Sequence, residues 1–485
     1  MKIHLIVAPS SSRVSLSEFS EDIAPPLGIG YIAASLRQAF PEASFKISDG
    51  LISGLETVHR EAEAFAADIV FISFFTPQAQ GAYELVNLLK TRGEAPLIVL
   101  GGVHASSLPE EALERSLADI VVIGEGERAA VEIAKCFSDK SGFSDIDGII
   151  YRKGREIIRT RPPRFIQDIN SIPFPARDLL PMDKYKGWFV SKKTPETSMV
   201  WSRGCPYNCV FCSNLVWKCA TPAVRLRSPQ NIVAEMKHLR DEFGIQEVFD
   251  HSDEFNNNIE HAKEVCRQIK ESKLKMPWKA QLRAHPLPED LVRLMAEAGC
   301  WYVHLGVESG NEETLKGVGK HINLNQVVDA CRLLHKYGIK IFGLFMLFNV
   351  WEDEKKLCFE DVAMTRKTLK FAEYLVDKKL LDYISWTIAT PYPGSQLFEI
   401  ARRHKLIRKD LLANWERWLK DDSFIMDLPG ISKAEQSRLY SSGSWLRAKC
   451  YLRSGGFGMS HAGFFLRKAV KAFQIGFSGA RGILR

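Results

Sequence analysis

The chain has 485 residues, of which 46% are hydrophobic and 25% are charged. This composition excludes a disordered or fibrous protein and leaves room for two or three folded domains. No apolar run approaches the roughly 18 residues of a membrane-spanning helix. The opening MKIHLIVA is interpreted as a buried strand rather than a signal peptide, and we expect a cytoplasmic location. The net charge of +7 is uneven, because the last 45 residues hold eight cations and no acidic residue.

Residues 1–145 alternate between apolar runs and amphipathic stretches. The runs KIHLIVA, FKISD, ADIVFISFF, PLIVLGG and DIVVIGE are short and rich in β-branched residues. Near-continuous apolar strands that alternate with helices predict an α/β fold with a doubly wound, Rossmann-like parallel sheet. Ligands of such sheets bind in the loops at the carboxyl ends of the strands. Six residues of those loops are the strand-end candidates: Ser73, Gly101, Gly102, His104, Gly124 and Glu125.

The rest of the chain divides into a connector, a second α/β domain and a tail. Residues 146–195 contain a predicted β-hairpin, DGIIYRKGREIIRT, and a proline-punctuated segment, and we interpret them as an ordered linker. Residues 196–405 resume the strand–helix alternation, which predicts a full or partial TIM-like barrel with its chemistry at the carboxyl ends of the strands. Residues 406–485 are predicted to form a helical, basic C-terminal extension.

Three of the ten cysteines, Cys205, Cys209 and Cys212, are clustered in RGCPYNCVFC, directly after the candidate strand SMVWSR. Thiolates this close in sequence can converge on one centre, and iron–sulfur clusters are held by cysteine. Zinc is the competing metal, but a structural zinc site needs four ligands, with Cys219 as the available fourth. Three thiolates on a four-iron cluster would leave one iron open to a substrate or cosubstrate. The other cysteines are scattered, and we expect most of them to pack as small apolar side chains.

The segment RGCPYNCVFCSN, with the aromatic Phe211 before its last cysteine, resembles the signature of the radical S-adenosylmethionine superfamily. The resemblance implies a 4Fe–4S cluster on the three cysteines, whose open iron is chelated by the amino and carboxylate groups of S-adenosylmethionine. It also implies that the reduced cluster passes one electron to the sulfonium, which releases methionine and a 5′-deoxyadenosyl radical that abstracts hydrogen from the substrate. In such chemistry the protein supplies positioning and excludes water.

Four later segments resemble strand-end motifs of the same superfamily. In DHSDEF, Asp253 or Glu254 would approach the methionine amino group, and in QLRAHPL, Arg283 would pair with the methionine carboxylate. In HLGVESGN, Glu308 would reach the ribose or the methionine, and TPYPGSQLF would form the adenine-side turn. A carboxylate at a strand end is more often a helix cap or an ion-pair partner. The order of the segments, rather than any one of them, therefore supports the assignment.

The segments PPLGIGYIAASL, ADIVFISFFTPQ, GGVHASSLPEEAL and DIVVIGEGE resemble the cobalamin-binding domain that precedes the radical domain in one branch of the superfamily. Small residues at the strand ends would let a flat, wide macrocycle approach the sheet, so the strand-end candidates become candidate cobalamin contacts. The motif D-x-H-x-x-G is absent, which implies base-off binding without a histidine on cobalt. His104 is as compatible with a turn as with a ligand. A domain that binds nothing is the alternative.

The branch contains methyltransferases and enzymes such as the anaerobic cyclase of chlorophyll biosynthesis. We favour cobalamin-dependent methyl transfer to an unactivated carbon of a small-molecule substrate. Radical oxidative cyclisation or another C–H functionalisation is the alternative, and a non-catalytic iron–sulfur or cobalamin-binding protein is a third hypothesis. We expect an electron donor such as flavodoxin or ferredoxin, and no nucleic acid. In the tail, HAGFFLRKAVKAFQIGF predicts an amphipathic helix that either packs on the barrel or contacts a membrane surface, which would suit a hydrophobic or lipid-like substrate.

Overall fold

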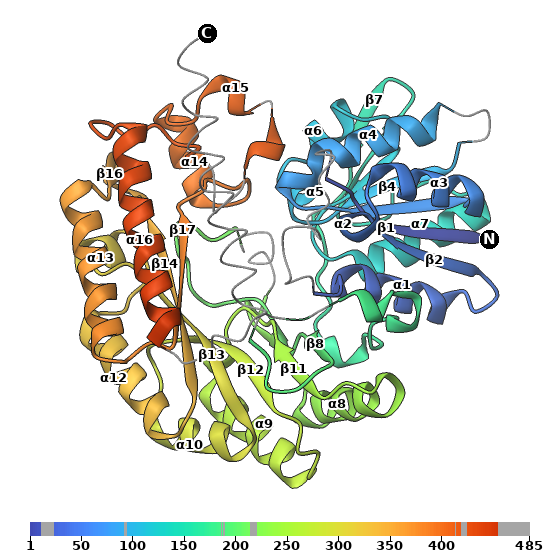
Figure 1. Ribbon diagram of the computed structural model, residues 1–485. Helices are drawn as coiled ribbons and strands as arrows, with labels where there is room; N and C mark the ends of the chain where they lie inside the picture. Colours follow the sequence, from blue (N-terminus) through green and yellow to red (C-terminus); the bar gives the residue numbers. More distant parts are fainter. Residues whose placement is uncertain are drawn as a thin grey trace.

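In the computed structural model, the chain folds into two α/β parts, and the strands of both run toward the middle of the molecule (Figure 1). The structure describes residues 1–10, 24–91, 95–185, 187, 190–213, 221–412, 414–418 and 424–453. The first part is built around one mainly parallel sheet and the second around another, with the connector between them.

A seven-stranded sheet forms the first part, in the order β2-β1-β3-β4-β5-β6-β7. Its parallel strands are β1 (Lys2–Val7), β2 (Ser44–Asp49), β3 (Ile69–Ser73), β4 (Leu97–Gly101) and β5 (Ile120–Val122). The hairpin expected in the connector is present as β6 (Ile149–Lys153) and β7 (Glu156–Arg159), and it extends this sheet by two antiparallel strands. The predicted Rossmann-like sheet is confirmed.

Helices cover both faces of this sheet, because alternate residues of a strand point to opposite sides. Along β3, Ile69 and Phe71 belong to one apolar core, with residues of α1 (Leu27–Ala39) and α7 (Gly126–Asp139). Val70 and Ile72 belong to another, with residues of α3 (Leu55–Phe65) and α4 (Ala79–Lys90). The shorter helices of this part are α2 (Gly50–Ser53), α5 (Val103–Ser107) and α6 (Pro109–Glu114).

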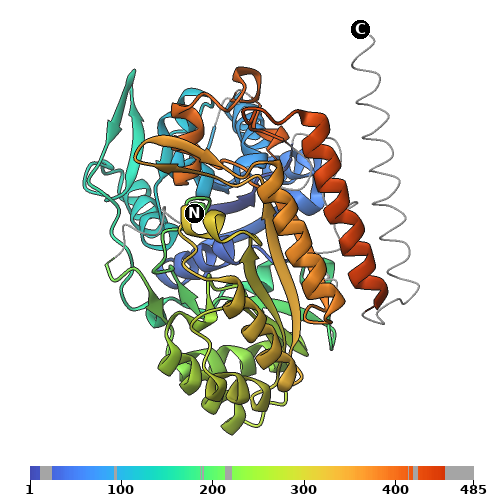
Figure 2. The same ribbon diagram turned by 90° about the vertical axis from the view of Figure 1, so that its left-hand side faces the viewer.

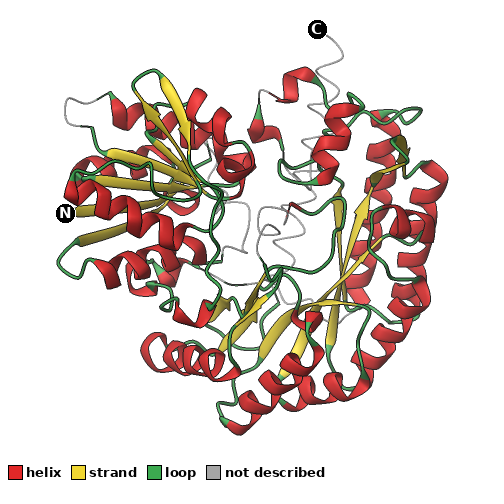
Figure 3. Cartoon of the chain, turned by 180° about the vertical axis from the view of Figure 1, so that it is seen from behind, coloured by secondary structure: helices red, strands yellow, loops and turns green. Residues whose placement is uncertain are grey.

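The second part is a six-stranded parallel sheet in the order β17-β14-β13-β12-β11-β8, curled into half of a barrel (Figure 3). Its strands are β8 (Glu196–Met199), β11 (Glu247–Asp250), β12 (Trp278–Arg283), β13 (Cys300–Glu308), β14 (Lys340–Leu347) and β17 (Tyr383–Ile388). Its helices include α8 (Pro229–Phe243), α9 (Ile259–Glu271), α10 (Glu289–Glu297), α11 (Glu312–Gly317), α12 (Leu324–Lys336) and α13 (Val362–Asp377). Because β8 and β17 are the two edges of the sheet, the predicted full or partial barrel is a partial one.

The last described helix, α16 (Lys433–Arg453), packs against β17 and α13 at one edge of the half-barrel (Figure 2). The remaining short elements are β9 (Ser202–Arg203), β10 (Arg225–Leu226), β15 (Val350–Asp353), β16 (Lys356–Phe359), α14 (Gln396–Arg403) and α15 (Lys409–Leu412). The amphipathic helix predicted within residues 461–477, and with it the membrane hypothesis, lies outside the described residues. None of the described helices has the length and apolarity needed to cross a membrane.

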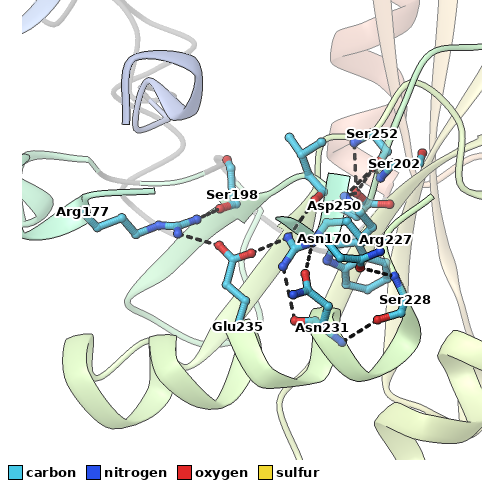
Figure 4. A network of polar contacts seen from close by, with 12 residues as sticks. Asn170, Arg177, Ser198, Ser202, Arg227, Ser228, Asn231, Glu235, Asp250 and Ser252 are labelled. Carbon is cyan, nitrogen blue, oxygen red and sulfur yellow. Dashed lines mark hydrogen bonds and ion pairs between the residues drawn. The ribbon is translucent and has the colours of Figure 1, made fainter. Parts of the chain in front are cut away.

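A buried ion network attaches the connector to the half-barrel (Figure 4). Arg177 donates to Glu235 of α8 (Nη1–Oε1 2.6 Å) and to the carbonyl oxygen of Ser198 (2.6 Å). Arg227 donates to the second carboxylate oxygen of Glu235. Because Glu235 is fully buried, loss of an arginine would leave its charge poorly compensated. The network therefore favours a single position of the connector against α8.

Candidate active site

The cysteine loop begins where β9 ends, beyond the first strand of the half-barrel. Gly204 has a φ of +90°, and a Cβ on it would collide with the carbonyl oxygen of Ala223, so only glycine fits there. The Gly204 amide donates to Asp253 (N–Oδ2 3.0 Å). These two constraints set the direction of the chain immediately before Cys205.

The three cysteines of the loop form no disulfide with any described residue, and they are partly buried. Cys209 Sγ lies 3.7 Å from the carbonyl oxygen of Gly319, and Cys205 Sγ lies 3.9 Å from Glu254 Oε2. The Cys212 amide donates to the carbonyl of Cys209 (3.0 Å). Burial raises the pKa of the Cys205 thiol to about 12, so its thiolate form needs a positive centre beside it. A bound metal centre supplies that charge.

The ligands of a four-iron cluster surround a wide centre, because each thiolate binds a different iron. A single zinc ion instead needs its ligands to meet at one point. Among the described residues, no three His, Cys, Asp or Glu side chains lie close enough to hold a metal ion in that way. Cys219, the fourth ligand of the zinc hypothesis, lies outside the described residues. The three thiols supply three ligands, the number that leaves one iron of a four-iron cluster open.

Two charged atoms beside the loop, Glu254 Oε1 and Arg283 Nη2, are buried without a hydrogen-bond partner in the described part of the chain. Glu254 follows β11 and is 6% exposed, and Arg283 ends β12 and is 3% exposed. The Arg283 guanidinium lies 3.8 Å from the ring centroid of Tyr207 in the cysteine loop. Buried polar atoms that lack a hydrogen-bond partner are costly, so these atoms fit a ligand that carries both an amino group and a carboxylate. The methionine moiety of S-adenosylmethionine carries both.

Glu308 ends β13 in the left-handed region, with a φ of +66°. Its carboxylate accepts a hydrogen bond from Lys320 (Oε1–Nζ 2.9 Å). The next residue, Ser309, donates to the buried carboxylate of Glu360 (2.7 Å), which also accepts from Thr368 (2.9 Å). Burial raises the pKa of the Glu360 carboxyl. This network holds a strained turn in place and so presents Glu308 at the barrel mouth.

A cavity of about 450 Å³ lies between the two parts of the molecule. From the first part, its lining includes Ser73, Gly101, Gly102, Gly124 and Glu125, and from the second part it includes Ser202, Arg203, Gly204, His251 and Asp253. At Gly28 and Gly101, both in the cavity wall, a Cβ would meet no atom within 4 Å. A side chain at either position would therefore project into open space. A wide ring such as a corrin fits a wall that is bare of side chains at these points.

His104 is the strand-end candidate that the structure does not bring into this cavity. It lies on α5, is fully buried, and has its Nδ1 3.1 Å from Thr76 Oγ1 and its ring 5.0 Å from the ring of Trp415. Burial lowers the pKa of His104 to about 3, so the ring is neutral. Phe211, the aromatic residue of the cysteine loop, is half-buried against the main apolar core.

The structure places three further charged residues at this site that were not among the predicted site residues: Arg203, Glu127 and Lys320. Arg203 and Glu127 do lie within the quoted segments RGCPYNCVFC and DIVVIGEGE. Arg203 donates to Glu125 (2.9 Å) and to Glu127 (2.5 Å). Its position directly before the cysteine loop is a signal that the sequence contains. Lys320 and Glu127 lie far from the cysteines along the chain, and only folding brings them to the site.

A cysteine loop fit for an open cluster and a cavity fit for a corrin share one wall, which defines the class as a radical S-adenosylmethionine enzyme with a cobalamin-binding domain. Comparison with known families agrees, since the radical SAM superfamily model matches residues 199–359 and the B12 binding domain model matches residues 18–134. The chain is also 33% identical over 484 residues to an uncharacterized methyltransferase of Pyrococcus horikoshii, with 97% of each chain covered. The chain belongs to this family, and its cofactors are a 4Fe–4S cluster, S-adenosylmethionine and cobalamin.

Other relatives carry names of two reaction types. Cytidylyl-2-hydroxyethylphosphonate methyltransferase of Streptomyces wedmorensis is 28% identical over 66% of this chain and 68% of its own length. The anaerobic magnesium-protoporphyrin IX monomethyl ester cyclase of Cereibacter sphaeroides is 25% identical over 78% of this chain and 60% of its own length. Among solved structures, the cobalamin-dependent radical enzyme OxsB with aqua-cobalamin bound shares the fold, with a TM-score of 0.70, 18% identity, and coverage of 97% of this chain and 76% of OxsB.

Proposed function

We propose that the enzyme transfers a methyl group to an unactivated carbon of a small molecule. The observation that carries this proposal is the shared cavity, which is lined by strand ends of the first sheet and also by Gly204 and Asp253 beside the cysteine loop. A methyl donor in the cavity and a radical formed at the loop would then act on one substrate held between them. The relatives named as methyltransferases support this reaction over the others.

When bound, the cofactors would supply the chemistry: one S-adenosylmethionine would yield methionine and a 5′-deoxyadenosine that keeps the substrate hydrogen, and a second would provide the methyl group that replaces it and leave as S-adenosylhomocysteine. Two electrons from a donor of the flavodoxin or ferredoxin class balance the two sulfonium charges. The chain contributes placement, because Glu254 and Arg283 would hold the methionine moiety while Glu308 holds the side of the ribose or methionine. The apolar wall around Gly28 and Gly101 excludes water and competing hydrogen donors.

Radical ring formation without methyl transfer is the second candidate, and the cyclase relative is the observation in its favour. It would use the same cysteine loop and the same placement of S-adenosylmethionine. The two reactions differ in the fate of the methyl group, because a cyclase would leave it on S-adenosylmethionine or on methionine.

The test follows the methyl group. The protein is reconstituted anaerobically with iron, sulfide, cobalamin and reduced flavodoxin, and is then given methyl-labelled S-adenosylmethionine. Methyl transfer predicts label in the bound cobalamin even before an acceptor is known, together with 5′-deoxyadenosine. Production of 5′-deoxyadenosine with no label in cobalamin would favour cyclisation. The variant Cys358→Ser alters a partly exposed cysteine outside the loop and is the matched control that should retain labelling.

A further inference from the structure

Two arginines of the second part hold the turn that begins α7 in the first part. Arg203 of β9 donates to Glu125 (Nη1–Oε1 2.9 Å) and to Glu127 (Nη2–Oε1 2.5 Å). Arg225 of β10 donates to the other oxygen of Glu125 (2.8 Å). The two arginines are paired across the antiparallel β9 and β10. We call these four residues the interdomain bridge.

The carboxylates of the interdomain bridge are shielded from water, and the bridge forms part of the cavity wall. The side chains of Glu125 and Glu127 are only 3% and 6% exposed, and both residues line the cavity together with Arg203. The Arg203 guanidinium also lies 5.2 Å from the ring centroid of Tyr31. A guanidinium that reaches two carboxylates is held in one orientation, because its donors have a fixed geometry. An occupant of the cavity would therefore adjoin three residues of this bridge.

The interdomain bridge is also connected to the cysteine loop by a short and constrained stretch of backbone. Arg203 is separated from Cys205 by Gly204 alone, and Gly204 is constrained on two further sides. Its amide donates to Asp253 (3.0 Å), and its Cα faces the carbonyl of Ala223 so closely that no side chain fits. A change in the position of the Arg203 guanidinium must therefore move either these contacts or the first cysteine of the loop.

We propose that Arg203 is a positioning residue that couples the two cofactor sites, so that filling of the cavity by cobalamin stabilises the cluster-bearing form of the cysteine loop. The inference goes beyond the methyl transfer proposed above and rests on that proposal only for cobalamin as the occupant of the cavity. Coupling between two sites is reciprocal. The loaded cluster must then tighten cobalamin binding by the same factor by which cobalamin stabilises the loop.

The coupling is measured as the ratio of the cobalamin dissociation constants of the cluster-free and the cluster-loaded protein, by equilibrium dialysis with hydroxocobalamin. In the unmodified protein we expect a ratio of about 5 or more, the lower end of usual coupling between sites. Arg203→Gln should bring the ratio to about 1, because the link between the sites is lost. Arg203→Lys keeps a charge but not the two-pronged contact, and should give an intermediate ratio. The matched control is Arg177→Lys. Arg177 is also a buried arginine that pairs with the carboxylate of another segment, Glu235, and its variant should keep the original ratio.

A second readout is the spectrum of the reduced cluster, whose change on addition of cobalamin should be present in the unmodified protein and absent in Arg203→Gln. A ratio near unity in the unmodified protein, or the original ratio retained in Arg203→Gln, overturns the proposal. If the unmodified protein fails to bind hydroxocobalamin at all, it is the proposed function that is wrong. If Arg203→Gln does not fold, Arg203→Lys and Glu127→Gln decide in its place, since each removes one prong of the bridge and must lower the ratio.

Discussion

The carboxyl edges of the two sheets meet at one cavity, yet apart from the interdomain bridge they bring different kinds of residue to it. The first sheet brings bare backbone at Gly101, with Gly28 of α1 beside it, and an apolar side chain, Phe75, that is 61% exposed. The half-barrel brings charge, with Glu254 and Arg283 buried and incompletely paired beside three thiols.

The difference matches the cofactor that we propose for each edge. Unpaired buried charge is costly, so it persists where a ligand returns the opposite charge, as a zwitterionic methionine would at Glu254 and Arg283. A wide macrocycle instead needs room and dispersion contacts, which glycine and aromatic residues provide. Residue chemistry at a strand end thus separates two kinds of cofactor site on two sheets of similar α/β architecture. Four predictions follow this contrast from the largest expected effect to the smallest.

Removal of a thiol from the charged edge should abolish the radical chemistry and spare the other edge. In Cys205→Ala we expect 5′-deoxyadenosine formation to fall roughly 10³-fold or more, as for loss of an essential catalytic group. Cobalamin should still bind, weaker only by the coupling factor between the two sites, which is usually about 5- to 150-fold. Iron content, 5′-deoxyadenosine yield and hydroxocobalamin dialysis measure the two effects. An equal collapse of both would mean that the two edges are not separate sites.

A large side chain in the cavity wall of the first sheet should weaken cobalamin binding and leave the cluster intact. A Gly101→Leu side chain would project into the cavity, and we expect cobalamin to bind about 10- to 100-fold more weakly, from an overpacking cost of about 1–3 kcal/mol. The cluster should still assemble, as shown by its absorbance and iron content. Gly142→Leu is the matched control, because a Cβ there also meets no atom within 4 Å but lies outside the cavity. Unchanged cobalamin affinity in Gly101→Leu would place the macrocycle elsewhere.

Loss of one charge at the carboxyl end of the half-barrel should weaken the binding of S-adenosylmethionine and leave the iron content of the protein unchanged. For Arg283→Met and Glu254→Gln we expect its dissociation constant to rise about 10- to 100-fold, the usual worth of about 1.5–3 kcal/mol for a hydrogen bond to a charged group. Isothermal titration on the cluster-loaded protein measures the change. Arg293→Met removes an exposed arginine of α10 and should bind as the unmodified protein does. Equal affinity in all three variants would remove these residues from the site.

Acid should destabilise the first part of the molecule through its buried histidines. Burial lowers the pKa of His104 to about 3, below the value near 6.5 expected in the unfolded chain. The stability contributed by the neutral ring is complete above about pH 6.5 and is lost as the pH falls toward 3, because the unfolded chain binds the proton first. At pH 5 the loss from His104 is about 2 kcal/mol.

Urea midpoints at pH 7 and pH 5 report this loss. His104→Gln should show a smaller drop between the two pH values than the unmodified protein. His4→Gln, on β1 of the same part, offers an independent repeat, since burial also lowers the pKa of His4 to about 3. An identical drop in both variants and in the unmodified protein would contradict the assignment of these rings as neutral and buried.

Much of the fold was predictable because each element depends on local patterns. Apolar runs that alternate with amphipathic stretches define the strands and helices of both parts, and six successive units indicate a barrel. Whether that barrel closes depends on whether the two edge strands, β8 and β17, can pair, which no local pattern encodes. The hairpin of β6 and β7 was predictable as a hairpin, but its pairing with β5 is a long-range contact.

The sequence by itself determined the cysteine loop, because three thiols, a glycine and an aromatic residue lie within a dozen positions and their spacing encodes the chemistry. It also indicated the acidic and basic strand ends that would receive S-adenosylmethionine. Only the tertiary structure decided that His104 packs against Trp415 instead of lining the cavity, and that Arg203 joins the cysteine loop to Glu125 and Glu127. The physical reason is that burial and ion pairing depend on which distant segments meet, whereas a ligand motif depends on residues that are neighbours in the chain.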